Sequence, residues 1–334
     1  MPIANAQAIV DRLLAFQADV REVIRLSHAK GGNAEVAHET AADTIFAIDA
    51  DVDPILIDLC EQWGKEQPLV LIAEGIHDEH GVEGPRVFPA GTPRERAEIR
   101  VIVDPIDGTR GIMYDKRPAW ALAAVAPNKG DATRLSDVEI SVMTELPTSK
   151  MGWADVLYAI KGEGARGFRV DLRTHDRAEL TIAPSKADTI KHGFAGVSDF
   201  FPGTKVQAGE LMEQIVRATI GPADVTKAMV FEDQYICTGG QFYELIVGHD
   251  RFNADLRPMF YEMVGGPEGL CVHPYDVGGL LIAQEVGVVI TDGLGNELDG
   301  PLDVTTSLSW AGFANATLRD QIQPIITAFF ADKH

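Results

Sequence analysis

The chain has 334 residues, of which 46% are hydrophobic, so it can bury a substantial core and is not a disordered chain. Its 50 acidic residues outnumber 29 basic ones, and the resulting net charge of -21 argues against nucleic acid or an anionic membrane as the main partner. The three cysteines are an odd number at wide spacing, so they imply no disulfide framework and favour a reducing compartment.

The first residues contain no basic segment followed by a long apolar stretch, and no run of about eighteen apolar residues occurs anywhere. The sequence therefore predicts neither a signal peptide nor a membrane span. We expect a soluble, cytoplasmic protein with no membrane partner.

Helical spacing of apolar residues predicts a first helix over 6–28. A second helix is predicted to begin at Asp53-Pro54, with Asp53 as the N-cap, and to end at Trp63-Gly64. Its start could also lie as early as Asp49, because the sequence does not settle that boundary.

Two short β-rich runs follow, and both lead into carboxylates. The run 69–73 precedes Glu74, and the run 99–103 precedes Asp104. Further strands are predicted over 120–125 and 156–160.

The second half also alternates strands and helices, with helices predicted over 209–219 and 277–285 and a strand over 288–291. This alternation predicts a layered α/β protein with two domains, 1–180 and 181–334.

The strongest chemical signal is a heptapeptide that places two carboxylates three residues apart at a strand end, Asp104-Pro-Ile-Asp107-Gly-Thr109-Arg110. Hard divalent cations prefer oxygen ligands, and backbone N–H groups at the start of a helix or turn suit a phosphate oxygen. The alternative is an ordinary surface turn, for which Asp, Pro and Gly are preferred residues. Direct arrival from an apolar strand, together with the second carboxylate-terminated strand at Glu74, favours a metal site.

With Glu74 upstream and Tyr275-Asp276-Val-Gly-Gly downstream, this motif resembles the inositol monophosphatase family. The three motifs occur in the family's order at compatible separations. The resemblance implies a layered αβαβα sandwich related to fructose-1,6-bisphosphatases and 3′-phosphoadenosine nucleotidases. It also implies a lithium-sensitive phosphomonoesterase with two or three Mg²⁺ ions in a cleft between domains, and homodimers are common in such families.

The resemblance also implies a role for each matching residue. The first domain would contribute most metal ligands and the second Asp276 and substrate loops. The implied metal ligands are Glu74, Asp104, the carbonyl of Ile106, Asp107 and Asp276. Thr109 and Asp49 would orient the attacking water, and the phosphate would be bound by Gly108, Thr109 and Arg110. From the residues alone, Arg110 could equally form an exposed salt bridge, and Asp276 could cap a helix.

Three positions depart from the family pattern. Gly75 stands where the family usually has a second Glu, and Tyr275 replaces the usual Trp. The segment 248–272 is longer than its counterpart near the substrate-binding wall. These departures leave the phosphate chemistry intact but make the substrate uncertain.

Other metal-like patterns are weaker. Asp49-x-Asp51-x-Asp53 begins like a calcium loop but has Pro54 where Gly is needed. Cys271-x-His273 lacks a second pair at zinc-ligand spacing. Gly239-Gly240 lacks nucleotide-loop spacing and fits a tight turn or close packing instead.

The sequence thus predicts a Mg²⁺-dependent enzyme that hydrolyses a small polyol or sugar phosphate. The alternatives are a 3′(2′),5′-bisphosphate nucleotidase or a fructose-1,6-bisphosphatase-like enzyme. A regulatory module that binds metal without catalysis is a further alternative, for which Gly75 is the one favourable sign.

Overall fold

The structure is a computed structural model that describes residues 3–29, 36–39, 44–77, 81, 84–267 and 269–331; the side chains of 29, 36–39 and 44–51 lie outside this description. Its largest unit is an eight-stranded sheet in which most neighbours are antiparallel and β3 and β5 are parallel. In spatial order the strands are β10 (Arg177–Glu179), β9 (Ala165–Asp171), β8 (Trp153–Ile160), β7 (Ile140–Leu146), β6 (Ala119–Pro127), β5 (Ile99–Asp107), β3 (Leu69–Ala73) and β4 (Arg86–Phe88).

A second sheet of four strands is built from the C-terminal half of the chain. Its order is β11 (Phe194–Val197), β12 (Asp250–Asp255), β14 (Trp310–Phe313) and β13 (Val289–Thr291), and a separate pair is formed by β1 (Val36–Glu39) and β2 (Thr44–Phe46). The α-helices are α1 (Ala6–Ala29), α2 (Ala47–Glu66), α3 (Thr109–Met113), α4 (Lys205–Ile220), α5 (Thr238–Ile246), α6 (Arg257–Met263), α7 (Leu280–Glu285) and α8 (Ala316–Ala331); 3₁₀ turns span Arg94–Arg96 and Leu135–Asp137.

The central strands of the large sheet are buried on both faces, and the alternation of side chains along them explains how. In β6, Trp120 and Leu122 face one apolar cluster, whereas Ala121 and Ala123 face another. Because successive side chains of a strand point to opposite faces, one apolar run can supply both clusters. This accounts for strands that are continuously apolar rather than alternating with polar residues.

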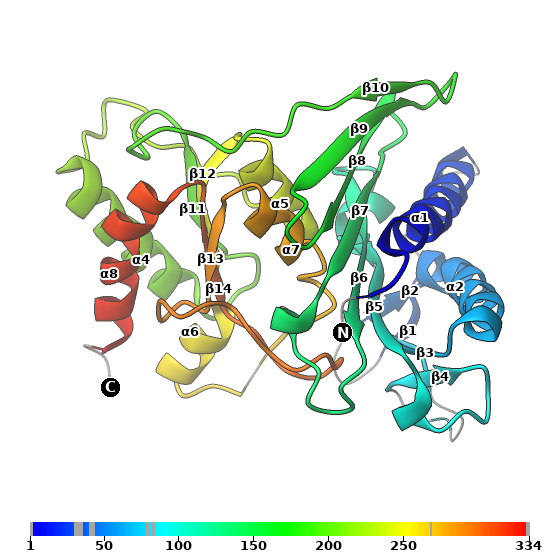
Figure 1. The fold of residues 1–334 in the computed structure, drawn as a ribbon. Helices are drawn as coiled ribbons and strands as arrows, with labels where there is room; N and C mark the ends of the chain where they lie inside the picture. Colours follow the sequence, from blue (N-terminus) through cyan, green and yellow to red (C-terminus); the bar gives the residue numbers. More distant parts are fainter. Residues whose placement is uncertain are drawn as a thin grey trace.

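These clusters define five layers. Helices α1 and α2 cover one face of the large sheet, and α5 and α7 lie between the large and the small sheet. Helices α4 and α8 cover the outer face of the small sheet. Figure 1 shows these layers side by side, from α1 and α2 at the right to α4 and α8 at the left. The fold is therefore the layered αβαβα arrangement that the sequence resemblance implied.

The predicted first helix and the strand Leu69–Ala73 are confirmed, but the predicted starts of α2 and α7 are wrong. Pro54 lies inside α2, which begins at Ala47, so Asp53 is not its N-cap. Helix α7 begins at Leu280, after a turn that contains Asp276. Proline inside a helix costs one backbone hydrogen bond, and burial of the apolar face of α2 offsets that cost.

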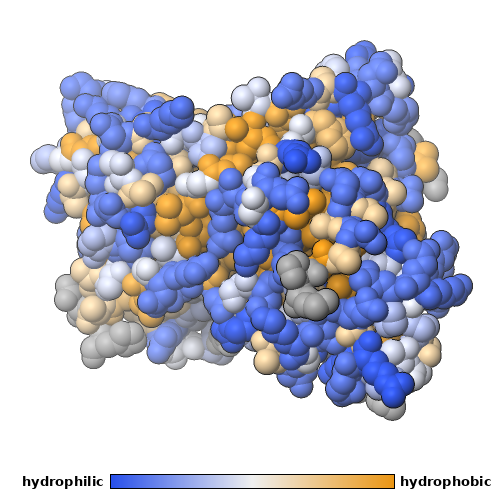
Figure 2. Space-filling model, in the orientation of Figure 1, coloured by the Kyte–Doolittle hydropathy of each residue, from blue (hydrophilic) through white to orange (hydrophobic). Residues whose placement is uncertain are grey.

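The two sheets come from either side of residue 180, but α5 and α7 of the second half pack against strands of the first. The division into domains 1–180 and 181–334 stays a prediction. Within the described residues, every helix is too short or too polar to cross a lipid bilayer. Figure 2 shows that one face is mainly hydrophilic, with apolar patches toward its middle.

Candidate metal centre

A bulge in β5 brings the two carboxylates of the heptapeptide together. Asp104 pairs with Leu122 and Asp107 with Trp120, so three steps along β5 match two steps along β6. On a regular strand, residues three apart point to opposite faces. The extra residue of the bulge cancels that alternation and turns both side chains toward the same side. The strand thus runs on through Asp107, whereas the sequence analysis ended it before Asp104.

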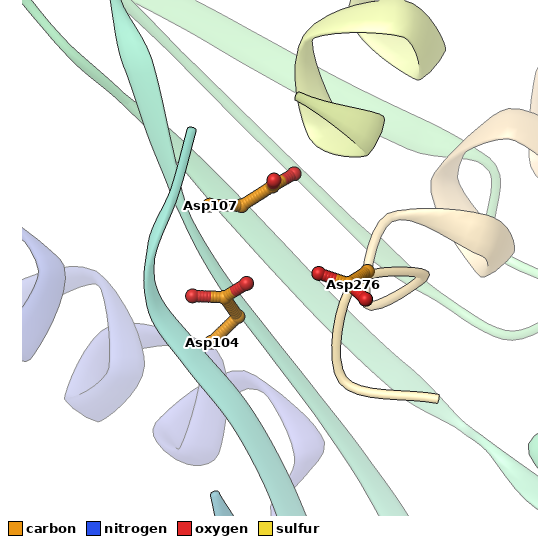
Figure 3. Close-up of side chains that lie close together, drawn as sticks. All are labelled: Asp104, Asp107 and Asp276. Atoms are coloured by element: carbon orange, nitrogen blue, oxygen red, sulfur yellow. The ribbon is translucent and has the colours of Figure 1, made fainter. Parts of the chain in front are cut away.

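Asp276 completes a group of three carboxylates. It lies in the turn before α7, and its Oδ2 accepts a hydrogen bond from the backbone N–H of His273 at 2.6 Å. Asp276 thus supports its own turn and is not the N-cap of α7. One carboxylate oxygen from each of Asp104, Asp107 and Asp276 lies within 4.8 Å of the others. Figure 3 shows the three side chains pointing toward one another from β5 and from this turn.

The start of α5 holds Asp107 in place. The backbone N–H groups of Thr238 and Gly239 donate to its carboxylate, and the Cys237 thiol donates to its carbonyl oxygen at 3.0 Å. A Cβ on Gly239 would lie 2.8 Å from Leu122 Cδ2 and 3.1 Å from Asp107 Oδ2. Glycine at position 239 therefore permits the close approach of α5 to the carboxylates, which is the packing role expected for this segment.

Burial raises the pKa values of the three aspartates, and repulsion from neighbouring carboxylates adds to it at Asp104 and Asp276. Burial is the main cause at Asp104, where the charges of Asp107 and Asp276 raise the pKa further. Burial also raises the pKa of Asp276 well above its usual range. The pKa of Asp107 rises to about 6 through burial, against the opposing effect of the N–H groups of α5. The ionised cluster therefore requires a compensating positive charge.

The donor set fits a hard divalent cation. Its three carboxylates offer only oxygen atoms, which Mg²⁺ prefers over nitrogen or sulfur, and the repulsion among them is what a cation would relieve. Glu74 lies just after β3 and lines the same cavity, and its charge also raises the pKa of Asp104 and Asp276. Gly75 has a φ of +70°, a conformation in which a glutamate would be strained.

The three candidate phosphate-binding residues, Gly108, Thr109 and Arg110, lie at the N-terminus of α3. Gly108 has a φ of +98° and directly precedes the helix, whose first residue is Thr109. The Thr109 hydroxyl donates to the carbonyl of Ile106 at 2.8 Å. Arg110 lines the cavity together with these residues. The Asp49 backbone belongs to α2, but its side chain lies outside the described residues, so its pairing with Thr109 stays a prediction.

Several cavity residues were missed by the sequence analysis. The cavity, of about 80 Å³, is also lined by Phe200, Phe201, Arg257 and His273. Arg257 lies in α6, within the segment 248–272 that the sequence analysis set apart as unusually long. The adjacent phenylalanines and the Asp255-x-Arg257 pair are sequence signals, but nothing local indicates that they reach the carboxylates.

Comparison with solved structures identifies the fold of this chain. Neither family models nor curated proteins match the sequence. Solved structures match along nearly the whole chain. An inositol monophosphatase from Thermotoga maritima has a TM-score of 0.61 and 16% identity, and the match covers 97% of this chain and 100% of that one. The extragenic suppressor protein SuhB from Bartonella henselae has a TM-score of 0.63 and 14% identity, with coverages of 96% and 98%.

A third structure, described as an inositol monophosphatase-fructose 1,6 bisphosphatase, has a TM-score of 0.62 and 15% identity and covers 94% of this chain and 98% of its own. These matched structures share the fold of inositol monophosphatases and fructose-1,6-bisphosphatases. This chain has that fold along nearly its whole length.

Proposed function

We propose that the protein is a Mg²⁺-dependent phosphomonoesterase that hydrolyses a small phosphate ester. The observation that carries the proposal is a group of three carboxylates within 4.8 Å of one another, two buried and one half-buried, next to the N-terminus of α3. In a protein of this fold, that combination supports a site for both a divalent cation and a phosphate.

In this proposal, two or three Mg²⁺ ions are held by Asp104, Asp107 and Asp276, with Glu74 and the Ile106 carbonyl as further ligands. Bound Mg²⁺ supplies charge neutralisation at the phosphoryl group and a water of lowered pKa. The role of the protein is to keep the carboxylates ionised and fixed in position. The N–H groups of α5 serve this purpose at Asp107.

The hydroxyl of Thr109 is suited to orient a water molecule. This hydroxyl donates to the Ile106 carbonyl, a bond that fixes its position at the start of α3. Asp49 is proposed as the partner in this task. The backbone N–H groups of Gly108 and Thr109, with the side chain of Arg110, are proposed to bind the phosphoryl oxygens.

The proposed leaving group is a small polyol or sugar. A bisphosphate substrate is the second candidate, either a 3′(2′),5′-bisphosphate nucleotide or a sugar bisphosphate, and one structural match carries a bisphosphatase description. A regulatory module that binds metal without catalysis is the least favoured hypothesis. Such a module would not need Thr109, the residue proposed to orient water, beside the carboxylates. Lithium sensitivity, a homodimer and a cytoplasmic location remain predictions.

The test is release of inorganic phosphate with Mg²⁺ from inositol monophosphates, sugar mono- and bisphosphates, and adenosine 3′,5′-bisphosphate. We expect release from at least one compound that stops with EDTA and falls at least 1,000-fold in Asp107→Asn. Asp320→Asn, at an exposed position of α8, is the matched control and should retain activity. Absence of release from every compound, with Mg²⁺ binding intact, would contradict the proposal and favour the regulatory module.

A further inference from the structure

A second cavity lies between helix α1 and strands β7 to β10, on the opposite face of the large sheet from the metal centre (Figure 1). It has a volume of about 170 Å³. Its Thr144 pairs with Ala121, whose side chain belongs to the apolar cluster under α1 and α2. Asp104 and Asp107 pair instead with residues of β6 that face α5. Among the described residues the two cavities share no lining residue, so this cavity is a separate feature.

Arg21 places an unpaired positive charge in this cavity. Its side chain is only 6% exposed and lines the cavity, and its Nε is a buried donor without an acceptor in the described part of the chain. The adjacent acid, Glu22, is already paired with Arg25 at 2.7 Å.

The surroundings of Arg21 do not compensate its charge. Burial lowers the pKa of Arg21, and repulsion from Arg177 and Arg25 lowers it further against the attraction of Glu22. A guanidinium group stays protonated in proteins, so the charge persists at neutral pH. A buried charge without a partner is costly, and an anion that enters the cavity would remove that cost.

The rest of the lining offers further hydrogen-bond donors. The exposed side chains of His175 and Arg177 line the cavity with Arg21. The Arg177 guanidinium carbon lies 4.3 Å from the ring centre of Phe168, a contact that positions the group and uses none of its N–H donors. Thr144 is 1% exposed, and its hydroxyl has no hydrogen-bond partner among the described residues. Within those residues the lining contains no carboxylate.

We propose that this cavity binds a small tetrahedral oxyanion, phosphate or sulfate, between the guanidinium groups of Arg21 and Arg177 and the hydroxyl of Thr144. Arginine and hydroxyl donors are the groups that recognise such an anion. The volume holds about five water molecules at roughly 30 Å³ each, which is enough for one such ion. The inference does not depend on the proposed phosphomonoesterase function, because it concerns a different face of the sheet.

Water or an apolar ligand accounts for this lining less well. A water molecule accepts a hydrogen bond from Arg21 but carries no charge, so the repulsion between Arg21 and Arg177 would remain. An apolar ligand would leave the Thr144 hydroxyl and the Arg21 Nε unsatisfied. An oxyanion accepts these hydrogen bonds and also neutralises the charge.

The experiment measures thermal unfolding of the full chain in EDTA while potassium phosphate or potassium sulfate is titrated. Potassium chloride at the same ionic strength is the baseline, and EDTA prevents phosphate from binding together with a metal ion at the metal centre. We expect at least one of the two oxyanions to raise the unfolding midpoint by about 3 °C or more, with saturation. The two separate titrations show which oxyanion the cavity prefers.

The variants assign the effect to residues. Arg21→Met should abolish the rise, and in chloride it should melt no lower than the wild type, because it removes an unpaired buried charge and keeps an apolar side chain. Arg177→Gln and Thr144→Val should each raise the half-saturating anion concentration about 10-fold, through loss of a hydrogen bond to a charged group. Arg217→Gln, at an exposed position of α4, is the charge-matched control for Arg177→Gln and should keep the full rise.

Three results would overturn the inference. The first is a rise that never saturates or that is equal in Arg21→Met, since either marks a general salt effect. The second is a rise that is lost in Arg110→Gln but kept in Arg21→Met, because that would place the anion in the metal cavity. If Arg21→Met fails to fold, weaker binding in both Arg177→Gln and Thr144→Val supports the site, and unchanged binding in both is the third contrary result.

Discussion

Replacement of Asp107 by Asn should stabilise the metal-free protein at alkaline pH. Burial raises the pKa of Asp107 to about 6 from a usual value of 3.8. Each unit is worth about 1.4 kcal/mol, so ionisation of this buried group at pH 8 lowers the free energy of unfolding by about 3 kcal/mol. Loss of charge-assisted bonds from the start of α5 offsets about 1 kcal/mol of this. The expected net gain for Asp107→Asn is about 2 kcal/mol.

The pH dependence follows from the direction of the shift. Because the folded-state pKa is the higher one, the contribution of Asp107 to stability is fully present below about pH 3.8. It is lost as the pH rises through about 6. The advantage of Asp107→Asn should therefore be largest at pH 8 and should disappear or reverse near pH 4.

The assay is urea unfolding followed by tryptophan fluorescence in EDTA at several pH values. With a denaturant slope of about 3 kcal/mol/M or more for a chain of this size, the midpoint at pH 8 should move up by about 0.5 M. Mg²⁺ should raise the midpoint of the wild type more than that of the variant. A variant less stable than the wild type at pH 8 in EDTA would refute the reasoning about the buried charges.

Three further substitutions probe the surroundings of the site. Gly239→Ala should reduce phosphate release more than tenfold, measured at saturating Mg²⁺, because its methyl group would meet the side chains around Asp107; an unchanged rate would show that α5 can move away freely. Asp155→Asn should lower the free energy of unfolding by about 1 to 2 kcal/mol, measured in urea, since the buried Asp155 carboxylate accepts hydrogen bonds from Tyr243 and from the exposed Arg169; an unchanged free energy of unfolding would contradict this. Burial raises the pKa of Glu145 to about 8, so its stabilising contribution is lost above that pH, and Glu145→Gln should melt higher than the wild type at pH 9 but not at pH 6; parallel melting curves would exclude the shift.

Local patterns in the sequence were enough to predict several elements. Apolar spacing located α1, and a five-residue apolar run located β3. Both are signals that a short window of sequence contains. The start of α2 could not be predicted, because Pro54 is a strong local signal that packing of the helix overrides.

The candidate site was predicted in its residue types more than in its geometry. The motif around Asp104 and its family resemblance named the three aspartates that the fold brings together. The bulge in β5 that makes them neighbours depends on pairing with β6, which a short window does not contain. Arg257 and Phe201 come from segments far along the chain, so their place in the cavity lining could not be predicted from local sequence.

The most direct test of the account is a Mg²⁺ titration of phosphate release in protein first treated with EDTA. The substrate is the best one in the panel, and the wild type is compared with Asp276→Asn and with Asp320→Asn. We predict that Mg²⁺ restores activity to the wild type and to Asp320→Asn but not to Asp276→Asn. Full activity in EDTA, or normal restoration of Asp276→Asn, would contradict the claim that the three clustered aspartates form a catalytic metal centre.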